Sequence, residues 1–177
     1  LALADRSRHG KKNVLIVRGG PGTGKSVVAI NLLVELTKRK HFAQYISKNS
    51  APREVYKAKL TGTLSKSRFD KLFTGSGGYH EVPHNTFDTL IVDEAHRLNE
   101  KSGLYANLGE NQIKEITEAA KCTIFFIDEG QRIHFKDIGR VDAIKQWASA
   151  AGAKVHELEL ASQFRCNGSD GYLAWLD

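Results

Sequence analysis

The sequence predicts an α/β fold in which helices flank a mostly parallel sheet of five strands. Short runs of β-branched and aromatic residues alternate along the chain with segments whose apolar residues recur at helical spacing. Two of these runs, residues 88–92 and 123–127, are almost continuously apolar, as in parallel strands that are buried on both faces. No hairpin signal joins any pair of runs. At 177 residues, the chain has the size of a single domain.

The first half of the chain contains two predicted strands and two predicted helices. Residues 13–17 form a β-branched strand that leads into glycines, and residues 26–36 form a helix. Residues 44–47 follow as a second strand, and a helix that opens with proline covers residues 52–60. Residues 61–85 are rich in Gly, Ser and Lys, so we expect a weakly ordered excursion there rather than a core element.

The second half continues the alternation of strands and helices. Strands are predicted at residues 88–92 and 123–127, with a helix at residues 112–120 between them. An amphipathic helix at residues 138–151 and a fifth strand at residues 155–160 complete the pattern. A repeated order of strand and then helix requires crossover connections, so the strands are predicted to be parallel.

The composition is that of an ordinary globular domain and excludes a membrane protein. Hydrophobic residues make up 41% of the chain and charged residues 26%. No apolar run reaches the roughly 18 residues that a membrane-spanning helix needs, and the start of the chain is charged rather than apolar. We therefore expect no membrane partner, and the two cysteines, Cys122 and Cys166, which lack the paired spacing of a metal site, favour reduced thiols in a cytoplasmic protein. The net charge of +6 suits a polyanionic partner, but many domains carry such a charge for solubility alone.

A phosphate-binding loop is predicted at residues 19–26, which read Gly-Gly-Pro-Gly-Thr-Gly-Lys-Ser after the first strand. Glycines let backbone N–H groups converge on phosphates, and the N-terminus of the following helix adds positive potential. Lys25 is predicted to reach the β- and γ-phosphates of ATP, and Ser26 to supply a hydroxyl to Mg²⁺. The residues that we expect to contact the nucleotide are Gly20, Pro21, Gly22, Thr23, Gly24, Lys25, Ser26 and Val27.

Two adjacent carboxylates, Asp93 and Glu94, follow the apolar run at residues 88–92. The carboxyl ends of parallel strands present the ligand site of an α/β sheet, so both carboxylates are predicted to lie near the phosphate-binding loop. We expect Asp93 to hold Mg²⁺ through its water shell. We expect Glu94 to polarise the water that attacks the γ-phosphate, which predicts hydrolysis of ATP rather than transfer of its phosphate.

Two further polar residues follow the later strands, and their chemistry alone leaves their roles open. Gln131 comes shortly after residues 123–127, where its amide can bond phosphate or attacking water, or can simply be exposed. Arg165 comes after the fifth strand. Its guanidinium can stabilise charge that develops on the γ-phosphate, or it can form an ordinary surface ion pair.

Four boxes resemble, in their order, those of superfamily 1 helicases. They are the phosphate-binding loop, the Asp-Glu-Ala-His box at residues 93–96, the Asp-x-x-Gln box at residues 128–131 and the Gln-Phe-Arg box at residues 163–165. The chain resembles in particular the Schlafen-type, helicase-like bacterial ATPase family. This resemblance implies a RecA-like three-layer sandwich, a P-loop NTPase fold, that covers residues 1–160. It also implies that residues 161–177 begin the connection to a second RecA-like domain, which is absent from the chain.

The resemblance also implies roles for individual residues. Gln131 would be a γ-phosphate sensor, and Arg165 would lie at the junction with the second RecA-like domain and complete the catalytic site there. Residues 47–50 resemble the segment that touches single-stranded DNA or RNA in such helicases, with Lys48 and Asn49 as phosphate contacts.

The sequence thus predicts the first ATP-hydrolysing lobe of a helicase-like protein, with ATP or ADP, Mg²⁺, single-stranded nucleic acid and a second lobe as partners. Two alternatives stay open: an ATPase of a signalling or defence protein that uses ATP as a switch without touching nucleic acid, and a P-loop small-molecule kinase, which Glu94 disfavours. The chain departs from the helicase pattern at Ile127, where many members have Gly, and lacks an adenine-reading glutamine motif before the loop. It contains no Met, so we also expect a fragment without its native start.

Overall fold

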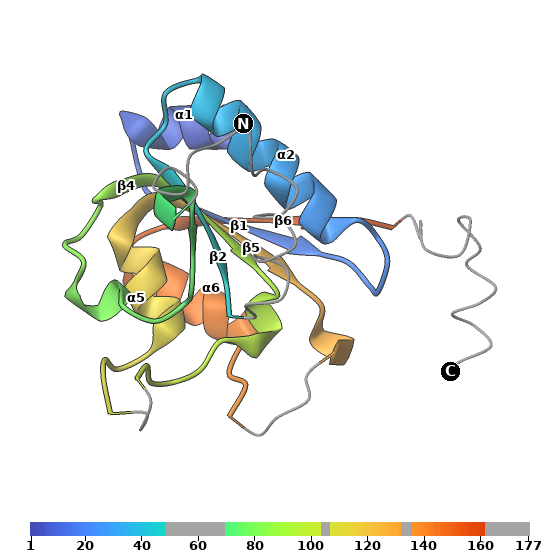
Figure 1. Ribbon diagram of the computed structural model, residues 1–177, viewed down its shortest axis with the longest axis vertical. Coiled ribbons are helices and arrows are strands. Elements are labelled where there is room, and N and C mark those ends of the chain that lie inside the picture. The colour runs from blue at the N-terminus through green and yellow to red at the C-terminus, as the bar shows by residue number, and fades with distance from the viewer. Residues whose placement is uncertain (49–69, 104–106, 132–135, 162–177) are drawn as a thin grey trace.

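A computed structural model describes residues 1–48, 70–103, 107–131 and 136–161, and these contain a single sheet of six parallel strands (Figure 1). The strand order is β3-β2-β4-β5-β1-β6. The strands are β1 (Asn13–Arg18), β2 (Ala43–Ser47), β3 (Phe73–Thr74), β4 (Phe87–Asp93), β5 (Ala120–Ile127) and β6 (Lys154–Glu159). The predicted parallel α/β sheet is confirmed, and β3 adds a sixth strand to the five that were predicted.

Helices cover both faces of the sheet, so the domain has three layers (Figure 1). One face carries α1 and α2, and the other carries α5 and α6. The helices are α1 (Ala2–Arg8), α2 (Lys25–Lys38), α5 (Gln112–Ala119) and α6 (Val141–Ala150), and the short 3-10 turns are η1 (Tyr79–Glu81), η2 (Ala95–Arg97) and η3 (Glu129–Gln131). Among these described helices, none is both long enough and apolar enough to cross a membrane.

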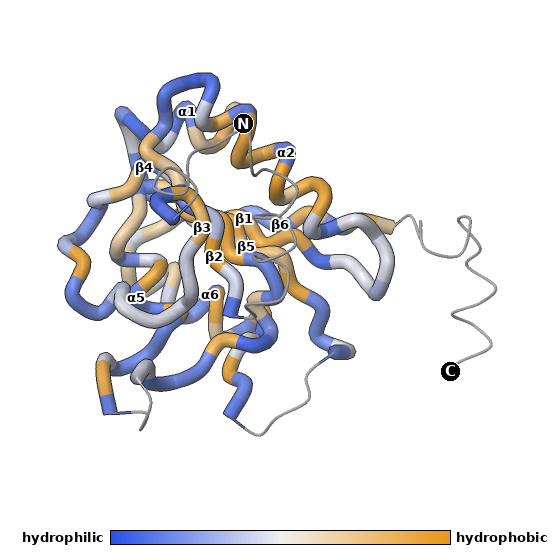
Figure 2. Tube along the Cα trace, viewed as in Figure 1, coloured by the Kyte–Doolittle hydropathy of each residue, from blue (hydrophilic) through white to orange (hydrophobic). Residues whose placement is uncertain are grey.

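The strands send alternate side chains into two separate hydrophobic clusters, one under each helical layer. In β4 all seven residues are buried: Leu90 and Val92 pack on the side of α5 and α6, and Ile91 packs on the side of α2. Figure 2 shows hydrophobic residues concentrated in the strands, with hydrophilic connections around them. Burial of one such side chain stabilises the fold by about 1.5–3 kcal/mol relative to exposure, which explains why β4 occupies the middle of the sheet.

Residues 70–85, the described part of the Gly- and Ser-rich excursion, contribute to the core, which corrects the prediction for that part. β3 pairs with β2 at the edge of the sheet, and Phe73 packs against Tyr45 with ring centroids 5.4 Å apart. Tyr79 is also buried, and its hydroxyl forms hydrogen bonds with Thr74 and Gln44. Because β3 has only two residues, it has no strand periodicity by which the sequence could reveal it.

The other predicted elements are present, with ends that differ by a few residues. α5 ends where the chain enters β5 directly, and α6 begins at Val141, later than predicted. The helix predicted at residues 52–60 lies outside the described residues. α1 was not predicted, and Asp5 ties it to the end of α2 through contacts with Arg39 at 2.7 Å and His41 at 2.9 Å.

Candidate nucleotide-binding site

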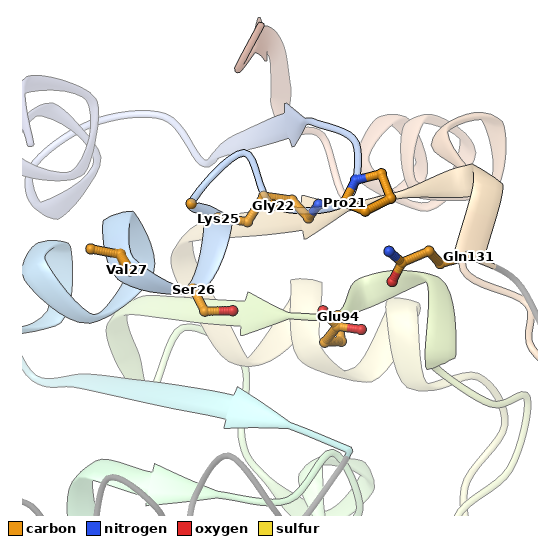
Figure 3. A pocket seen from close by; sticks show the side chains of 8 residues that line it. Pro21, Gly22, Lys25, Ser26, Val27, Glu94 and Gln131 are labelled. Carbon is orange, nitrogen blue, oxygen red and sulfur yellow. The ribbon is translucent and has the colours of Figure 1, made fainter. Parts of the chain in front are cut away.

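A cavity of about 250 Å³ lies at the carboxyl ends of β1, β4 and β5 (Figure 3). Parallel strands bring these ends to one edge of the sheet, so loops that are far apart in the sequence meet there. The phosphate-binding loop and the start of α2 form one part of the wall, and the turns after β4 and β5 form another. The lining residues are Pro21, Gly22, Gly24, Lys25, Ser26, Val27, Glu94 and Gln131.

Glycines and a threonine hold the phosphate-binding loop in its shape. Gly22 and Gly24 have φ angles of 77° and 81°, which glycine adopts without strain. The Thr23 hydroxyl donates to the backbone oxygen of Gly20 at 2.9 Å. A Cβ on Gly19 would lie 2.6 Å from the Oγ1 of Thr23, so a larger residue would disturb this contact. Loops of this kind turn successive backbone N–H groups to one side, where an anion can bind them.

Lys25 is buried in the wall of the cavity. Its side chain is 7% exposed, and its Nζ donates to the backbone oxygens of Gly19 at 2.5 Å and Gly20 at 2.7 Å. The carboxylate of Asp128, just after β5, lies 3.5 Å from the same nitrogen. The ammonium is therefore held by two neutral oxygens and one longer ion pair. A phosphate group in the cavity would compete well for it, because charge-assisted hydrogen bonds are the stronger ones.

Asp93 ends β4 as a buried carboxylate that is 1% exposed. The Tyr45 hydroxyl donates to its Oδ2 at 2.5 Å, and the backbone N–H of Glu94 donates to its Oδ1 at 3.0 Å. The Ser26 side chain is near enough to favour the charged form of this carboxylate. Burial raises the pKa of Asp93 above its usual value, and these hydrogen bonds oppose the rise. A carboxylate that is dry but well hydrogen-bonded is suited to interact with a cation.

Glu94 starts the turn after β4 with a φ of 54°, which is uncommon for a residue other than glycine. Its side chain is 25% exposed, and the Nε2 of His96 lies 3.1 Å from its Oε2. The hydrogen bond from His96 lowers the pKa of Glu94 below its usual value, and the positive charges of Lys25 and Arg97 lower it further. Glu94 is therefore a carboxylate at neutral pH.

His96 connects the turn after β4 with the end of β5. It is buried, and its Nδ1 accepts a hydrogen bond from the backbone N–H of Asp128 at 3.4 Å. Because Nδ1 is the acceptor, the hydrogen-bond network assigns the proton to Nε2, which donates to Glu94. The imidazole thus fixes the direction of the Glu94 carboxylate relative to the next strand.

Gln131 belongs to the turn after β5 and points into the cavity (Figure 3). The backbone N–H of Gly130 donates to the Oδ1 of Asp128 at 3.2 Å, which tightens this turn. The Oε1 of Glu129 accepts a hydrogen bond from the backbone N–H of Val141 at 3.1 Å, which ties the turn to the start of α6. The Gln131 amide therefore faces the same space as the phosphate-binding loop.

Residues 12–177 match the model of a protein family described as Schlafen group 3, DNA/RNA helicase domain. The match begins just before β1 and includes every residue assigned to the candidate site. The chain belongs to this family. The resemblance to superfamily 1 helicases of the Schlafen type, which the four boxes indicated, is thereby confirmed.

Several solved structures resemble this helicase domain across 89% of the chain. A DNA replication initiation factor is 16% identical with a TM-score of 0.45, and AMPPCP-bound DnaA from Aquifex aeolicus is 17% identical with a TM-score of 0.43. The Sulfolobus solfataricus SWI2/SNF2 ATPase core in complex with dsDNA is 10% identical with a TM-score of 0.45. The chain spans 44%, 44% and 42% of these three chains, so it is less than half as long as each of them.

The structure brings most of the predicted site residues of the helicase domain together. Of the residues predicted to contact the nucleotide, those that line the cavity are Pro21, Gly22, Gly24, Lys25, Ser26 and Val27. The other two, Gly20 and Thr23, form the hydrogen bond that shapes the loop. Glu94 and Gln131 complete the lining, and the Ser26 side chain at the start of α2 is near enough to Asp93 to affect its pKa. The chemical roles of these residues stay predictions.

The predicted nucleic-acid segment and the predicted arginine lie partly outside the described residues. Arg165 and Asn49 are both outside them. The Nζ of Lys48 donates to the Oδ1 of Asn99 at 2.8 Å and lies 3.3 Å from the Oδ1 of Asp137. Because an ammonium has three N–H donors, a nucleic-acid phosphate could contact Lys48 beside these partners or in place of one of them.

Sequence reasoning missed two residues that hold the site together, Tyr45 and Asp128. Tyr45 lies in an apolar strand, and the sequence does not distinguish it from a tyrosine that only fills the core. In the sequence, Asp128 is only the first residue of the Asp-x-x-Gln box. No neighbouring residue in the sequence indicates its contact with Lys25. Both contacts join residues that are distant in the sequence, so no motif reports them.

Gly139 packs against the turn that carries Glu94, and a side chain there would collide with backbone. A Cβ would lie 1.9 Å from the oxygen of Ala95 and 2.6 Å from the Cα of His96. Gly139→Ala should therefore lower the free energy of unfolding by about 1–3 kcal/mol, measured by urea denaturation. Gly77→Ala is the control, because its nearest contact would be 3.6 Å away. Equal losses for the two variants would contradict the close packing.

Proposed function

We propose that this chain binds ATP and Mg²⁺ and hydrolyses ATP, as the first motor lobe of a helicase-like protein. The observation that carries the proposal is a single cavity lined by Lys25, Glu94 and Gln131, beside the buried carboxylate of Asp93. A glycine loop, a helix N-terminus and a lysine are together suited to the phosphates of a nucleoside triphosphate. The carboxylates of Asp93 and Glu94 lie next to that position and differ in exposure. The buried carboxylate of Asp93 can interact with a cation, and the more exposed carboxylate of Glu94 can polarise a water.

Ser26 and Asp93 are the residues that would hold Mg²⁺ beside a bound nucleotide. Mg²⁺ prefers oxygen ligands, keeps several waters, and in such sites uses one or two carboxylates together with the substrate phosphates. The donor set fits this preference, because a hydroxyl at the start of α2 lies near a buried carboxylate at the end of β4. When bound, Mg²⁺ would neutralise charge on the β- and γ-phosphates.

Glu94 is the residue that we assign to the attacking water. Its lowered pKa keeps it ionised at neutral pH, so its carboxylate can accept a hydrogen bond from water and polarise it. His96 holds that carboxylate in one direction. Lys25 would stabilise the negative charge of the phosphates, and Gln131 would hydrogen-bond the γ-phosphate or the water. These roles predict release of inorganic phosphate, whereas a small-molecule kinase would deliver the phosphoryl group to an acceptor.

We assign Arg165 to the charge that develops on the γ-phosphate when this lobe closes on a second RecA-like domain. The support is family membership and the course of the chain just before it. β6 pairs with β1, and after β6 the backbone N–H of Leu160 donates to the oxygen of Arg18 at 2.8 Å. The chain therefore passes the start of the phosphate-binding loop before residues 161–177, which would begin the connection between the lobes.

We further propose that single-stranded DNA or RNA contacts the lobe at the end of β2. The family description supports a nucleic-acid partner, and the Lys48 side chain is 31% exposed. A nucleic-acid phosphate would form a charge-assisted contact with the Lys48 ammonium, beside Asp137 or in its place.

Lys25→Ala should weaken binding of a fluorescent ATP analogue by about 10- to 100-fold, because it removes a charge-assisted hydrogen-bond donor from the phosphate site. The measurement is an equilibrium titration of the full-length protein in Mg²⁺ buffer. Lys11→Ala is a matched control, since Lys11 is exposed and does not line the cavity. Unchanged affinity in Lys25→Ala would remove the proposed phosphate site.

Glu94→Gln should leave the affinity for ATP within about threefold of wild type and reduce steady-state phosphate release by about 10²- to 10⁴-fold. The amide keeps the shape of the side chain but no longer has the charge that polarises water. Glu110→Gln, an exposed residue before α5, should leave both quantities unchanged. Normal turnover in Glu94→Gln would exclude Glu94 as the group that activates water.

Single-stranded DNA or RNA should stimulate the ATPase of the full-length protein, with binding that weakens as salt concentration rises. Replacing Lys48 by Gln should reduce the slope of log affinity against log salt by about one contact. The measurement combines phosphate release with fluorescence anisotropy of a labelled oligonucleotide at two salt concentrations. Absence of both stimulation and salt-dependent binding would favour a nucleotide switch that does not touch nucleic acid.

A further inference from the structure

Two hydroxyl groups of β2 lie on the same face of the sheet as Asp93. β2 and β4 are parallel neighbours, with Tyr45 opposite Ile91 and Ser47 opposite Asp93. Tyr45 and Ile91 both belong to the hydrophobic cluster on the α2 side. Because side chains alternate along a strand, Ser47 and Asp93, two residues further on, face this side as well.

Tyr45 holds the Asp93 carboxylate in place. The tyrosine is fully buried, and its hydroxyl donates to the Oδ2 of Asp93 at 2.5 Å across a diagonal pair of neighbouring strands. The ring is packed against Phe73 of β3, so the hydroxyl has little freedom to move. The Oδ1 of Asp93 accepts the backbone N–H of Glu94 at 3.0 Å. One donor on each oxygen fixes the plane of the carboxylate.

Ser47 carries a buried hydroxyl without a hydrogen-bond partner among the residues that the structure describes. Its exposure is 0%, and polar atoms buried this deeply in proteins almost always have a partner, often an ordered water. Ser47 is the register neighbour of Asp93, so its hydroxyl is next to the proposed metal site. Mg²⁺ keeps several waters when it binds proteins, and each of these waters can donate hydrogen bonds.

We infer that β2 supplies the outer support of the metal site: Tyr45 orients the carboxylate of Asp93, and the Ser47 hydroxyl accepts a hydrogen bond from a water bound to Mg²⁺. This inference rests on the proposed binding of ATP with Mg²⁺. Both are positioning residues, because they act through Asp93 and through water rather than on the nucleotide. Groups in such outer positions set metal affinity by fixing the ligands that touch the ion. The inference also gives β3 a function, since Phe73 packs against the Tyr45 ring.

The test measures how much Mg²⁺ tightens nucleotide binding in Tyr45→Phe and Ser47→Ala. A fluorescent ATP analogue is titrated into the full-length protein in EDTA and again in Mg²⁺, and the ratio of the two affinities is the Mg²⁺-dependent gain. Both variants should keep the affinity in EDTA, because the phosphate-binding loop is unchanged. The gain should fall roughly tenfold in Tyr45→Phe and severalfold in Ser47→Ala.

Two control variants delete equivalent hydroxyls on the opposite face of the sheet. Tyr79→Phe removes a buried tyrosine hydroxyl that bonds Thr74 and Gln44, on the side of α5 and α6. Thr123→Val removes a buried hydroxyl that, like that of Ser47, has no partner among the described residues. Both controls should retain the full Mg²⁺-dependent gain even where their thermal stability falls.

The outcomes separate this inference from the function on which it rests. If wild type shows the gain and Tyr45→Phe and Ser47→Ala show it undiminished, β2 does not support the metal site, while binding of ATP with Mg²⁺ stands. An equal loss of the gain in the two controls would also overturn the inference, because it would indicate general loosening of the sheet. If wild type binds no nucleotide, or gains nothing from Mg²⁺, the proposed metal-dependent function fails and the inference fails with it.

Discussion

Burial of β4 on both faces is the constraint on which the rest of the structure depends. All seven of its residues are buried, with Leu90 and Val92 under one helical layer and Ile91 under the other. Such a strand cannot carry an unpartnered carboxylate in its middle, so its reactive groups stand at its end. Because β1 and β5 run parallel to it, their ends reach the same edge. The parallel direction of the strands therefore brings Lys25 and Glu94 to the wall of one cavity.

Contacts join Lys25, Asp128, His96 and Glu94 into one connected set. The ammonium of Lys25 lies beside Asp128, the backbone of Asp128 donates to His96, and His96 donates to Glu94. Hydrogen bonds in such a partly buried network reinforce one another, so loss of one member weakens the contacts of its neighbours. Such mutual contacts hold the side chains in fixed positions, which is the arrangement that the proposed phosphate site requires.

The edge of the sheet that lies away from β1 also contributes to the site, although it lines no part of the cavity. β3 brings Phe73 against Tyr45, and Tyr45 bonds Asp93. On the neighbouring strand end, Lys48 bonds Asn99 in the segment that follows the Asp-Glu-Ala-His box. Side chains of β2 and of the residue after it therefore contact the Asp93 carboxylate and the loop that contains Asn99. A displacement of this strand would move the Asp93 carboxylate at the candidate metal site.

The sequence by itself determined the alternation of strands and helices, the phosphate-binding loop and the carboxylates Asp93 and Glu94, because each depends on periodicity or on residues that are adjacent in the chain. Only the tertiary structure decided that Tyr45 contacts Asp93, that the backbone N–H of Asp128 bonds His96, and that Phe73 and Thr74 add a sixth strand. These are contacts between segments far apart in the sequence, made by residue types that are ordinary in a protein core. Local patterns carry no information about such pairs, because the packing of one strand against the next is what brings them together.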